Sequence, residues 1–357
     1  SEAFDTLGLT NYMDIMRLIT FVETTPATSD ENVTVTDTKF SDVAVRLYLP
    51  RGAPGGLRRG MVFFHGGGWC LGDAGMKSYD HMSRRISNEL NVVVVSVNYR
   101  LAPEHRFPSA FEDVYAVTKF FLQSRVLAQY GVDPARVCVA GDSAGGNLAA
   151  AVAQQLLEDP EVKTKLKAQI LIYPVLQALD LDLPSYRDNE NKPILPRSLM
   201  VRFWSEYFSS DPALREAMAH NRHVPAEAAH LFQFVNWSHL LPAGMRGAHE
   251  YRGPTLGSGA LARRYPGFLD LRASPLLAGD ARLRHLPHTY ILTCEHDVLR
   301  DDGVMYAQRL RALGVRVTHD HAQDAFHGAL MFNFWPMDLA VGHRLFSRYL
   351  EWVDENL

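Results

Sequence analysis

Short apolar runs alternate with helix-forming segments along most of this chain. The runs are rich in β-branched and aromatic residues, which favour buried strands. Strands are therefore expected at residues 32–38, 43–49, 61–64, 92–97, 136–140, 168–172, 287–294 and 315–321. The intervening segments predict helices at residues 77–90, 109–123, 144–157, 301–313 and 339–356. This alternation predicts an α/β fold with a mostly parallel, eight-stranded central sheet that helices flank on both faces.

Residues 180–270 break the alternation and place aromatic side chains among Pro and Gly turns. The aromatic residues are Phe203, Trp204, Tyr207, Phe208, Phe232, Phe234 and Trp237. We expect a helical cap whose apolar side chains line the substrate pockets and exclude water. The chain is then a single domain with a core at 31–179 and 271–357 and a cap at 1–30 and 180–270.

The first segment of the predicted cap carries apolar residues at helical spacing. Within residues 10–22, Met13, Met16 and Ile19 fall on one face of a helix. We expect this helix to pack into the cap, and two alternatives remain open. It could simply cover the core, or its apolar face could contact a membrane surface and collect lipid substrate.

Composition indicates a folded globular chain and argues against nucleic acid as a partner. The chain has 357 residues, of which 47% are hydrophobic, so it can bury a sizeable core. Its 36 basic and 40 acidic residues give a net charge of −4, without a basic stripe. No stretch of 18 apolar residues is present, so the chain as given is not expected to span a membrane.

The most informative motif is Gly-Asp-Ser-Ala-Gly-Gly-Asn at residues 141–147. It joins a predicted strand to a predicted helix, which is the context of a nucleophile elbow. In such a turn the serine backbone is strained, and Gly141 and Gly145 keep Cβ atoms out of the closely approaching strand and helix. The turn is therefore predicted to thrust Ser143 outward as the nucleophile.

A second motif, His-Gly-Gly-Gly-Trp at residues 65–69, follows the predicted strand 61–64. Consecutive glycines leave backbone N–H groups uncovered, and fixed donors of this kind stabilise the oxyanion formed in acyl transfer. We expect the N–H groups of Gly67, Gly68 and Ala144 to form the oxyanion hole, with Gly66 shaping the loop.

A serine nucleophile needs a base and a carboxylate that orients the base. Asp297 follows the predicted strand 287–294, at the sheet edge where α/β folds place their chemistry. His327 lies in a predicted loop after strand 315–321 and is the expected base. Three other carboxylates are rivals for the orienting role. They are Asp301 and Asp302, which fit the cap and first turn of the next helix, and Asp324.

His319 and His321 share one face of a predicted strand. They could be packed, face solvent or, with Asp324, bind a metal, but a zinc site needs a clearer third or fourth ligand. No metal and no cofactor are expected for the reaction.

Cys70 and Cys294 sit on predicted loops at one edge of the sheet, and we expect a disulfide between them. Two buried thiols are the alternative. Cys138 should stay a packed thiol.

Four stretches together resemble the hormone-sensitive lipase branch of the α/β-hydrolases. They are His-Gly-Gly-Gly-Trp at 65–69, Tyr-Arg-Leu-Ala-Pro-Glu-His-Arg-Phe-Pro at 99–108, the serine motif at 141–147 and Asp-Val-Leu-Arg-Asp at 297–301. The resemblance implies a Ser143–His327–Asp297 serine carboxylesterase or amidase that hydrolyses acyl esters and arylamides. A long-chain glyceride or sterol ester lipase, and a non-catalytic ligand-binding module of the same fold, remain alternatives.

The same resemblance implies a location at the endoplasmic reticulum membrane, with the catalytic domain in the lumen. A signal anchor would then lie outside this chain and provide the contact with the membrane. Glycosylation sequons at Asn32-Val-Thr and Asn236-Trp-Ser are compatible with a lumenal protein, so both asparagines are expected acceptors. The oligomeric state leaves no signal in the sequence.

Overall fold

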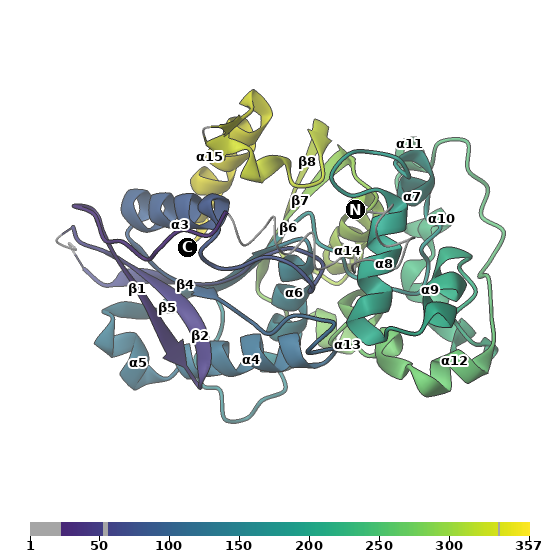
Figure 1. Cartoon of the computed structure of the whole chain (residues 1–357), viewed down its shortest axis with the longest axis horizontal. Coiled ribbons are helices and arrows are strands. Elements are labelled where there is room, and N and C mark those ends of the chain that lie inside the picture. The colour runs from purple at the N-terminus through teal and green to yellow at the C-terminus, as the bar shows by residue number, and fades with distance from the viewer. Residues whose placement is uncertain (1–22, 53–55, 335) are drawn as a thin grey trace, which may run out of the picture.

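The computed structural model describes residues 23–52, 56–334 and 336–357. An eight-stranded sheet runs through it in the order β1-β2-β4-β3-β5-β6-β7-β8 (Figure 1). Only the β1–β2 and β2–β4 pairs are antiparallel; the other five pairs are parallel. The strands are β1 (Val33–Phe40), β2 (Val43–Pro50), β3 (Arg58–Phe64), β4 (Val92–Val97), β5 (Val132–Asp142), β6 (Ala168–Ile172), β7 (His288–His296) and β8 (Val317–Phe326). The predicted mostly parallel sheet of eight strands is confirmed.

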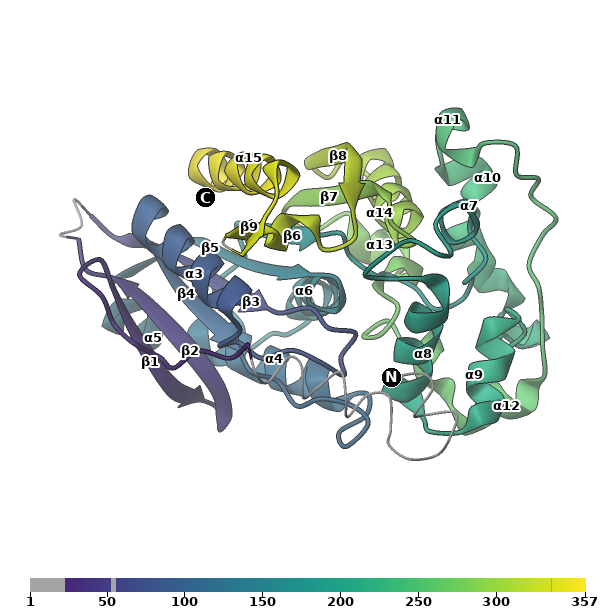
Figure 2. The ribbon, with the colours of Figure 1, turned by 45° about the horizontal axis from the view of Figure 1, so that its top comes forward.

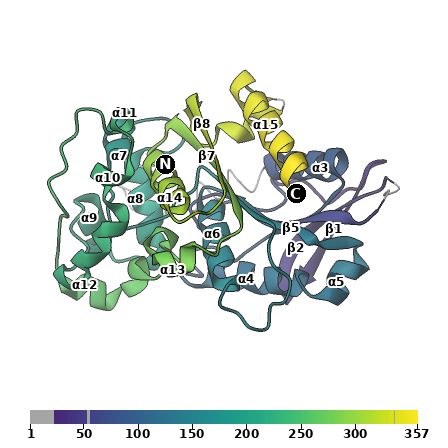
Figure 3. The ribbon, with the colours of Figure 1, turned by 180° about the vertical axis from the view of Figure 1, so that it is seen from behind.

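Helices cover both faces of the sheet and create two layers of core. Helices α3 (Lys77–Leu90) and α15 (Ala340–Asn356) bury their apolar faces on one side of the sheet (Figure 2). The opposite side, seen in Figure 3, carries α4 (Ser109–Phe121), α5 (Ser124–Gln129), α6 (Ala144–Leu156) and α14 (Arg300–Ala312). All six residues of β4 are buried, because an inner strand between two helical layers has no solvent-facing side.

The cap is a group of short helices beyond one end of the sheet (Figure 1). Its elements are α7 (Pro184–Asp188), α8 (Arg197–Phe208), α9 (Pro212–Ala219), η1 (Ala226–Val235), α10 (Trp237–Leu240), α11 (Ala243–Arg246), α12 (Gly259–Arg264) and η2 (Pro266–Leu269). Its aromatic side chains join the hydrophobic cluster of the α4 and α6 side, so cap and core share one apolar interior. The remaining short elements are η3 (Pro275–Leu277), α13 (Asp280–Leu283), η4 (Ala329–Met331), β9 (Asn333–Phe334) and β10 (Met337–Asp338).

Part of the segment predicted to belong to the cap lies on the core instead. The N–H of Thr25 donates to the carbonyl of Gly75 at 2.8 Å, and Asp30 forms an ion pair with Arg84 of α3. Residues 23–30 therefore run along the core next to α3. The predicted amphipathic helix at residues 10–22 lies outside the described residues. Among the described helices, none has the length and apolar character needed to cross a bilayer.

Strand β8 is longer than its sequence pattern predicts. It continues to Phe326, so Asp324 lies in the strand and not in the expected loop. The pairing with β7 shifts register between Cys294 and His296, which indicates a bulge or irregularity at this point. Bulges re-aim the residues that follow them, and here Asp297 and His327 follow directly.

Candidate active site

Ser143 occupies the tight turn between β5 and α6. Its backbone adopts φ 55° and ψ −117°, and its N–H donates to the carbonyl of Ile172 at 2.9 Å. This is a sparsely populated conformation for a residue with a Cβ, with a typical cost of about 1–3 kcal/mol. The surrounding strand and helix therefore hold the serine in the strained elbow that the motif predicts.

Two glycines make this turn possible because strand and helix nearly touch. A Cβ on Gly145 would lie 1.9 Å from the carbonyl oxygen of Phe64, and one on Gly141 would lie 2.3 Å from the carbonyl oxygen of Gly145. These atoms belong to the backbone and cannot swing aside. The two glycines of the motif are needed for close approach, as their spacing around Ser143 suggests.

The structure brings the three predicted catalytic side chains into one hydrogen-bonded chain. The Oγ of Ser143 lies 3.0 Å from Nε2 of His327, and Nδ1 of His327 lies 2.8 Å from Oδ2 of Asp297. The other carboxylate oxygen of Asp297 accepts the N–H of Leu299 at 2.9 Å. All three side chains are buried. This arrangement lets His327 take the proton of the serine while Asp297 orients the ring.

The three rival carboxylates bind other partners and not His327. Asp324 forms an exposed ion pair with Arg344. Asp301 and Asp302 lie in the first turn of α14, as predicted, but their role differs from that of an N-cap. The oxygens of Asp302 accept the N–H of Leu176 at 2.8 Å and the side-chain amide of Gln177 at 3.0 Å. These carboxylates anchor the segment that leads into the cap.

Asp301 and its neighbour Arg300 extend the same anchor. Oδ2 of Asp301 accepts the N–H of Ser185, the second residue of α7, at 2.7 Å. The Arg300 guanidinium donates to Glu295, to Asp301 and to the carbonyl of Met245 in the cap. Sequence reasoning missed this anchor, because an acidic first turn of a helix is adequately explained by local capping.

The glycine loop after β3 is shaped as an oxyanion loop. The N–H of Gly66 donates to Oδ1 of Asp142 at 2.8 Å and to the hydroxyl of Tyr79 at 2.9 Å, so Gly66 fixes the loop. Gly67 and Gly68 follow with φ of 112° and 59°. Within the described ranges, the structure shows no hydrogen-bond acceptor for the N–H groups of Gly67, Gly68 and Ala144. Their role as oxyanion donors stays a prediction.

Asp142 connects the elbow to this loop and was not singled out from the sequence. Burial raises the pKa of Asp142 to about 7, against the opposing effects of nearby His327, the N–H of Gly66 and the hydroxyl of Tyr79. His65 also contacts the loop: its ring stacks on Tyr99 with centroids 4.3 Å apart, and its Nδ1 lies 2.7 Å from the carbonyl oxygen of Gly66. Both backbone polar groups of Gly66 are thus bound by side chains.

Aromatic side chains of the cap pack against the oxyanion loop. A Cβ on Gly68 would lie 2.2 Å from Cγ of Phe203, a residue of α8 that is 5% exposed. The Phe203 ring therefore rests directly on the glycine. Next to it, Trp69 stacks on Tyr207 with ring centroids 4.3 Å apart. The position of Gly68 depends on both its positive φ and the space that Phe203 leaves.

Replacing Gly68 with alanine is therefore expected to displace the loop. We expect kcat to fall by about a hundredfold to a thousandfold, the effect of losing one oxyanion donor. The Gly68→Ala/Phe203→Ala double variant should recover part of this loss, because removing the ring makes room for the methyl group. Steady-state kinetics on an acetyl ester measures both. No recovery in the double variant would mean that the ring contact does not set the loop position.

The predicted histidine pair forms a polar cluster at the outer strand. His319 Nε2 and His321 Nδ1 lie 2.8 Å and 2.9 Å from the hydroxyl of Thr293, and His321 Nε2 lies 3.0 Å from Glu295. Burial lowers the pKa of His319 to about 4. Across the part of the chain that the structure describes, no group of three His, Cys, Asp or Glu residues could hold a metal.

Cys70 and Cys294, predicted to form a disulfide, are not joined in the structure. Both are thiols, and Cys138 is a buried thiol as expected. Cys70 packs in the cluster on the α4 and α6 side of the sheet, whereas Cys294 packs in the cluster under α3 and α15. The structure holds the two as separate buried thiols, and the disulfide between Cys70 and Cys294 stays a prediction.

The two sequons lie at accessible positions. Asn32 is exposed before β1, and Asn236 is half-buried before α10, where its Oδ1 accepts the N–H of Ser238 at 3.1 Å. Glycosylation of Asn32 and Asn236, and with it the lumenal location, stays a prediction.

Comparison with known proteins agrees with this geometry. A family model described as alpha/beta hydrolase fold matches residues 61–237 and 258–331. The arylacetamide deacetylase of Oryctolagus cuniculus is 58% identical over 351 residues, covering 98% of this chain and 87% of that protein. Neutral cholesterol ester hydrolase 1 of Bos taurus is 48% identical over 335 residues, covering 93% of this chain and 82% of that protein.

Solved structures give the same assignment. An esterase of Pyrobaculum calidifontis superposes with a TM-score of 0.69 at 27% sequence identity, covering 99% of this chain and 96% of that chain. The resemblance read from the motifs is confirmed, and it is particularly close to arylacetamide deacetylases. With a family model and whole-length relatives in agreement, the chain belongs to the α/β-hydrolase family, as a serine hydrolase.

Proposed function

We propose that this chain hydrolyses carboxylic esters and arylamides by two-step acyl transfer. The observation that carries the proposal is the hydrogen-bonded chain from Asp297 through His327 to Ser143. Ser143 Oγ attacks the acyl carbonyl while Nε2 of His327 takes its proton, and Asp297 stabilises the imidazolium. His327 then protonates the departing alcohol or amine, and water releases the acyl group by the same steps.

Backbone donors complete this mechanism. The N–H groups of Gly67, Gly68 and Ala144 would hold the negative charge of the tetrahedral intermediate. Buried donors that are already oriented stabilise such a charge better than water does, because they need no reorganisation. The Phe203 ring over Gly68 supports this arrangement by keeping one side of the loop dry.

The substrates we propose are small acyl groups on aromatic leaving groups. The relatives named arylacetamide deacetylase support this class. The cap also supports it, because the buried aromatic side chains Trp69, Tyr207 and Trp204 pack together and make the surroundings of the oxyanion loop apolar. Long-chain glycerides or sterol esters are the second candidate, favoured by the 48% identity to neutral cholesterol ester hydrolase 1.

Turnover across acyl length separates the two candidates. We expect kcat/KM for p-nitrophenyl esters to be highest between acetyl and butyryl and to fall at least about tenfold by palmitoyl, because each misfit in an apolar pocket costs about tenfold or more. Acetanilide should be hydrolysed measurably. The matched control is the Ser143→Ala variant, which corrects for background hydrolysis. A maximum at oleoyl would instead establish the lipase.

A further inference from the structure

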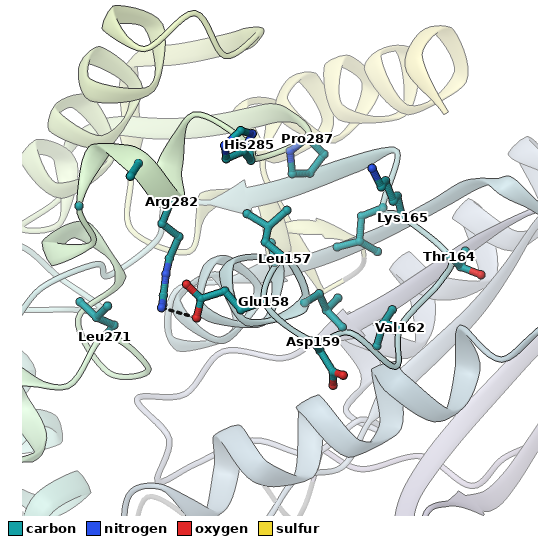
Figure 4. Close-up of a pocket in the computed structure, with 15 residues that line it drawn as sticks. Leu157, Glu158, Asp159, Val162, Thr164, Lys165, Leu271, Arg282, His285 and Pro287 are labelled. Carbon is teal, nitrogen blue, oxygen red and sulfur yellow. Dashed lines mark hydrogen bonds and ion pairs between the residues drawn. The ribbon is translucent and has the colours of Figure 1, made fainter.

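A cavity of about 740 Å³ opens beside the C-terminal end of α6 (Figure 4). It lies between the C-terminal end of α6, the loop at 157–166 and the segment 271–287. Ser143 precedes the other end of α6, whose 13 residues span about 20 Å. Pro287 and Leu166 line the cavity just before β7 and β6, at the amino ends of these strands. The cavity, which we name the α6-end pocket, is therefore separate from the triad.

The walls of the α6-end pocket are mainly aliphatic. Leu156, Val162, Leu166 and Leu271 are half-buried, and Leu157 is 41% exposed. A volume of this size falls within the range of sites for small ligands, which is about 300–1,000 Å³. Exposed aliphatic surface gathered in a concave site is favourably covered by an apolar ligand.

The acidic side chains that line the pocket have ion-pair partners, whereas two of its basic side chains have none among the described residues. Glu158 forms an ion pair with Arg282 at 2.5 Å, and Asp159 is held by Lys119 at 2.8 Å. Both acidic groups of the lining are thereby neutralised. Lys165 and His285 line the same pocket, and within the described ranges the structure gives neither a carboxylate partner. Figure 4 shows both side chains, with Pro287 between them in this view.

We propose that the α6-end pocket binds the anion of one long-chain fatty acid. The acyl chain would lie on the leucine walls, and the carboxylate would pair with Lys165 and accept a hydrogen bond from His285. The positive charges of Lys165 and Arg282 in the lining select an anion over a neutral lipid, and the concave shape of the pocket selects a single chain over a membrane surface. This site would sense free fatty acid independently of the reaction at Ser143.

The test is calorimetric titration of the whole protein with dodecanoate below its micelle concentration. An organophosphonate first blocks Ser143, so that the active site contributes no binding. We expect one molecule to bind, and decanoate, which is two methylenes shorter, to bind about fifteenfold more weakly, because each buried methylene contributes about fourfold in affinity. Dodecanol should bind less tightly than dodecanoate.

Two matched pairs of variants locate the site. Leu157→Asp should lose dodecanoate binding, whereas Leu339→Asp, at a leucine 40% exposed elsewhere, should not. Lys165→Glu should weaken dodecanoate at least about tenfold and leave dodecanol unchanged, whereas Lys163→Glu, outside the lining, should have little effect. Unchanged hydrolysis of a short ester by all four proteins verifies their folding.

Three outcomes would overturn the proposal. Dodecanoate binding only before Ser143 is blocked would place it in the active site. Equal binding by the Leu157→Asp and Leu339→Asp proteins would place it elsewhere on the surface. Binding to vesicles of anionic phospholipid without binding of monomeric dodecanoate would make the patch a membrane contact. None of these results affects the proposed ester and amide hydrolysis, which acyl-length kinetics tests separately.

Discussion

The Ser143→Ala protein is expected to lose about a millionfold in kcat for an acetyl ester, which is the effect of removing the nucleophile from a serine triad. The loss should fall on the chemical step, because no other hydroxyl bonds to Nε2 of His327 in the described structure. The elbow itself should survive, since the strained backbone is imposed by β5, α6 and the close contacts of Gly141 and Gly145. Single-turnover kinetics measures the acylation rate directly.

Covalent labelling checks the same residue without relying on turnover. An organophosphonate should add one phosphonyl group to the wild-type protein and none to Ser143→Ala, as measured by intact mass. The control is Ser87→Ala, at a fully buried serine of α3, which should be labelled and turn over like wild type. A wild-type protein that resists labelling would favour the non-catalytic binding module of this fold. A rate above about one per cent of wild type in Ser143→Ala would assign the nucleophile elsewhere.

The parts of the molecule that local sequence dictates were predictable. The valines of β4 fit only a strand buried on both faces. The glycines around Ser143 fit only a close strand-to-helix turn, because the gap at Gly145 is too small for a methyl group. These patterns depend on neighbouring residues or on the order of elements along the chain. They can therefore be interpreted without knowledge of tertiary contacts.

Features that depend on tertiary partners were not predictable. An acidic pair such as Asp301 and Asp302 reads as a helix start whether it caps the helix or holds a distant segment. Cys70 and Cys294 were expected on loops, but Cys294 lies in β7, and the two thiols pack in different hydrophobic clusters whose members are distant in the chain. The role of Asp142 likewise depends on Gly66 and Tyr79, which lie 76 and 63 positions away in the chain.

The contacts of Arg300 and Asp301 connect the cap to the loop that carries the catalytic aspartate. Arg300 and Asp301 follow the catalytic Asp297 closely and bind the cap at Met245 and Ser185. Leu299, whose N–H holds the Asp297 carboxylate, precedes them directly. The loop that presents the orienting carboxylate is therefore also the loop that fastens the cap. A movement of the cap is therefore expected to displace this loop and, with it, the carboxylate of Asp297.

Replacing Asp297 with asparagine is expected to lower kcat by about ten-thousandfold. The amide has the size of the carboxylate, and its carbonyl oxygen can still accept the N–H of Leu299. Its NH₂ group would then face Nδ1 of His327, which forces the ring into the tautomer that cannot accept the serine proton. KM should change little, because Asp297 is 1% exposed and supplies orientation and charge. Steady-state kinetics on an acetyl ester measures both constants.

The matched control for this variant is Asp324→Asn. Asp324 is the rival acid three residues before His327, and its carboxylate is bound to Arg344 at the surface. Losing an exposed ion pair costs little, so this protein should keep a rate near wild type. Circular dichroism melting of both variants separates a catalytic effect from unfolding. Equal rates for the two variants, or a larger loss in Asp324→Asn, would show that Asp297 does not orient the base. A much lower rate in Asp297→Asn than in Asp324→Asn, with similar melting, would show that the hydrogen bond at 2.8 Å between Asp297 and His327 serves catalysis rather than stability.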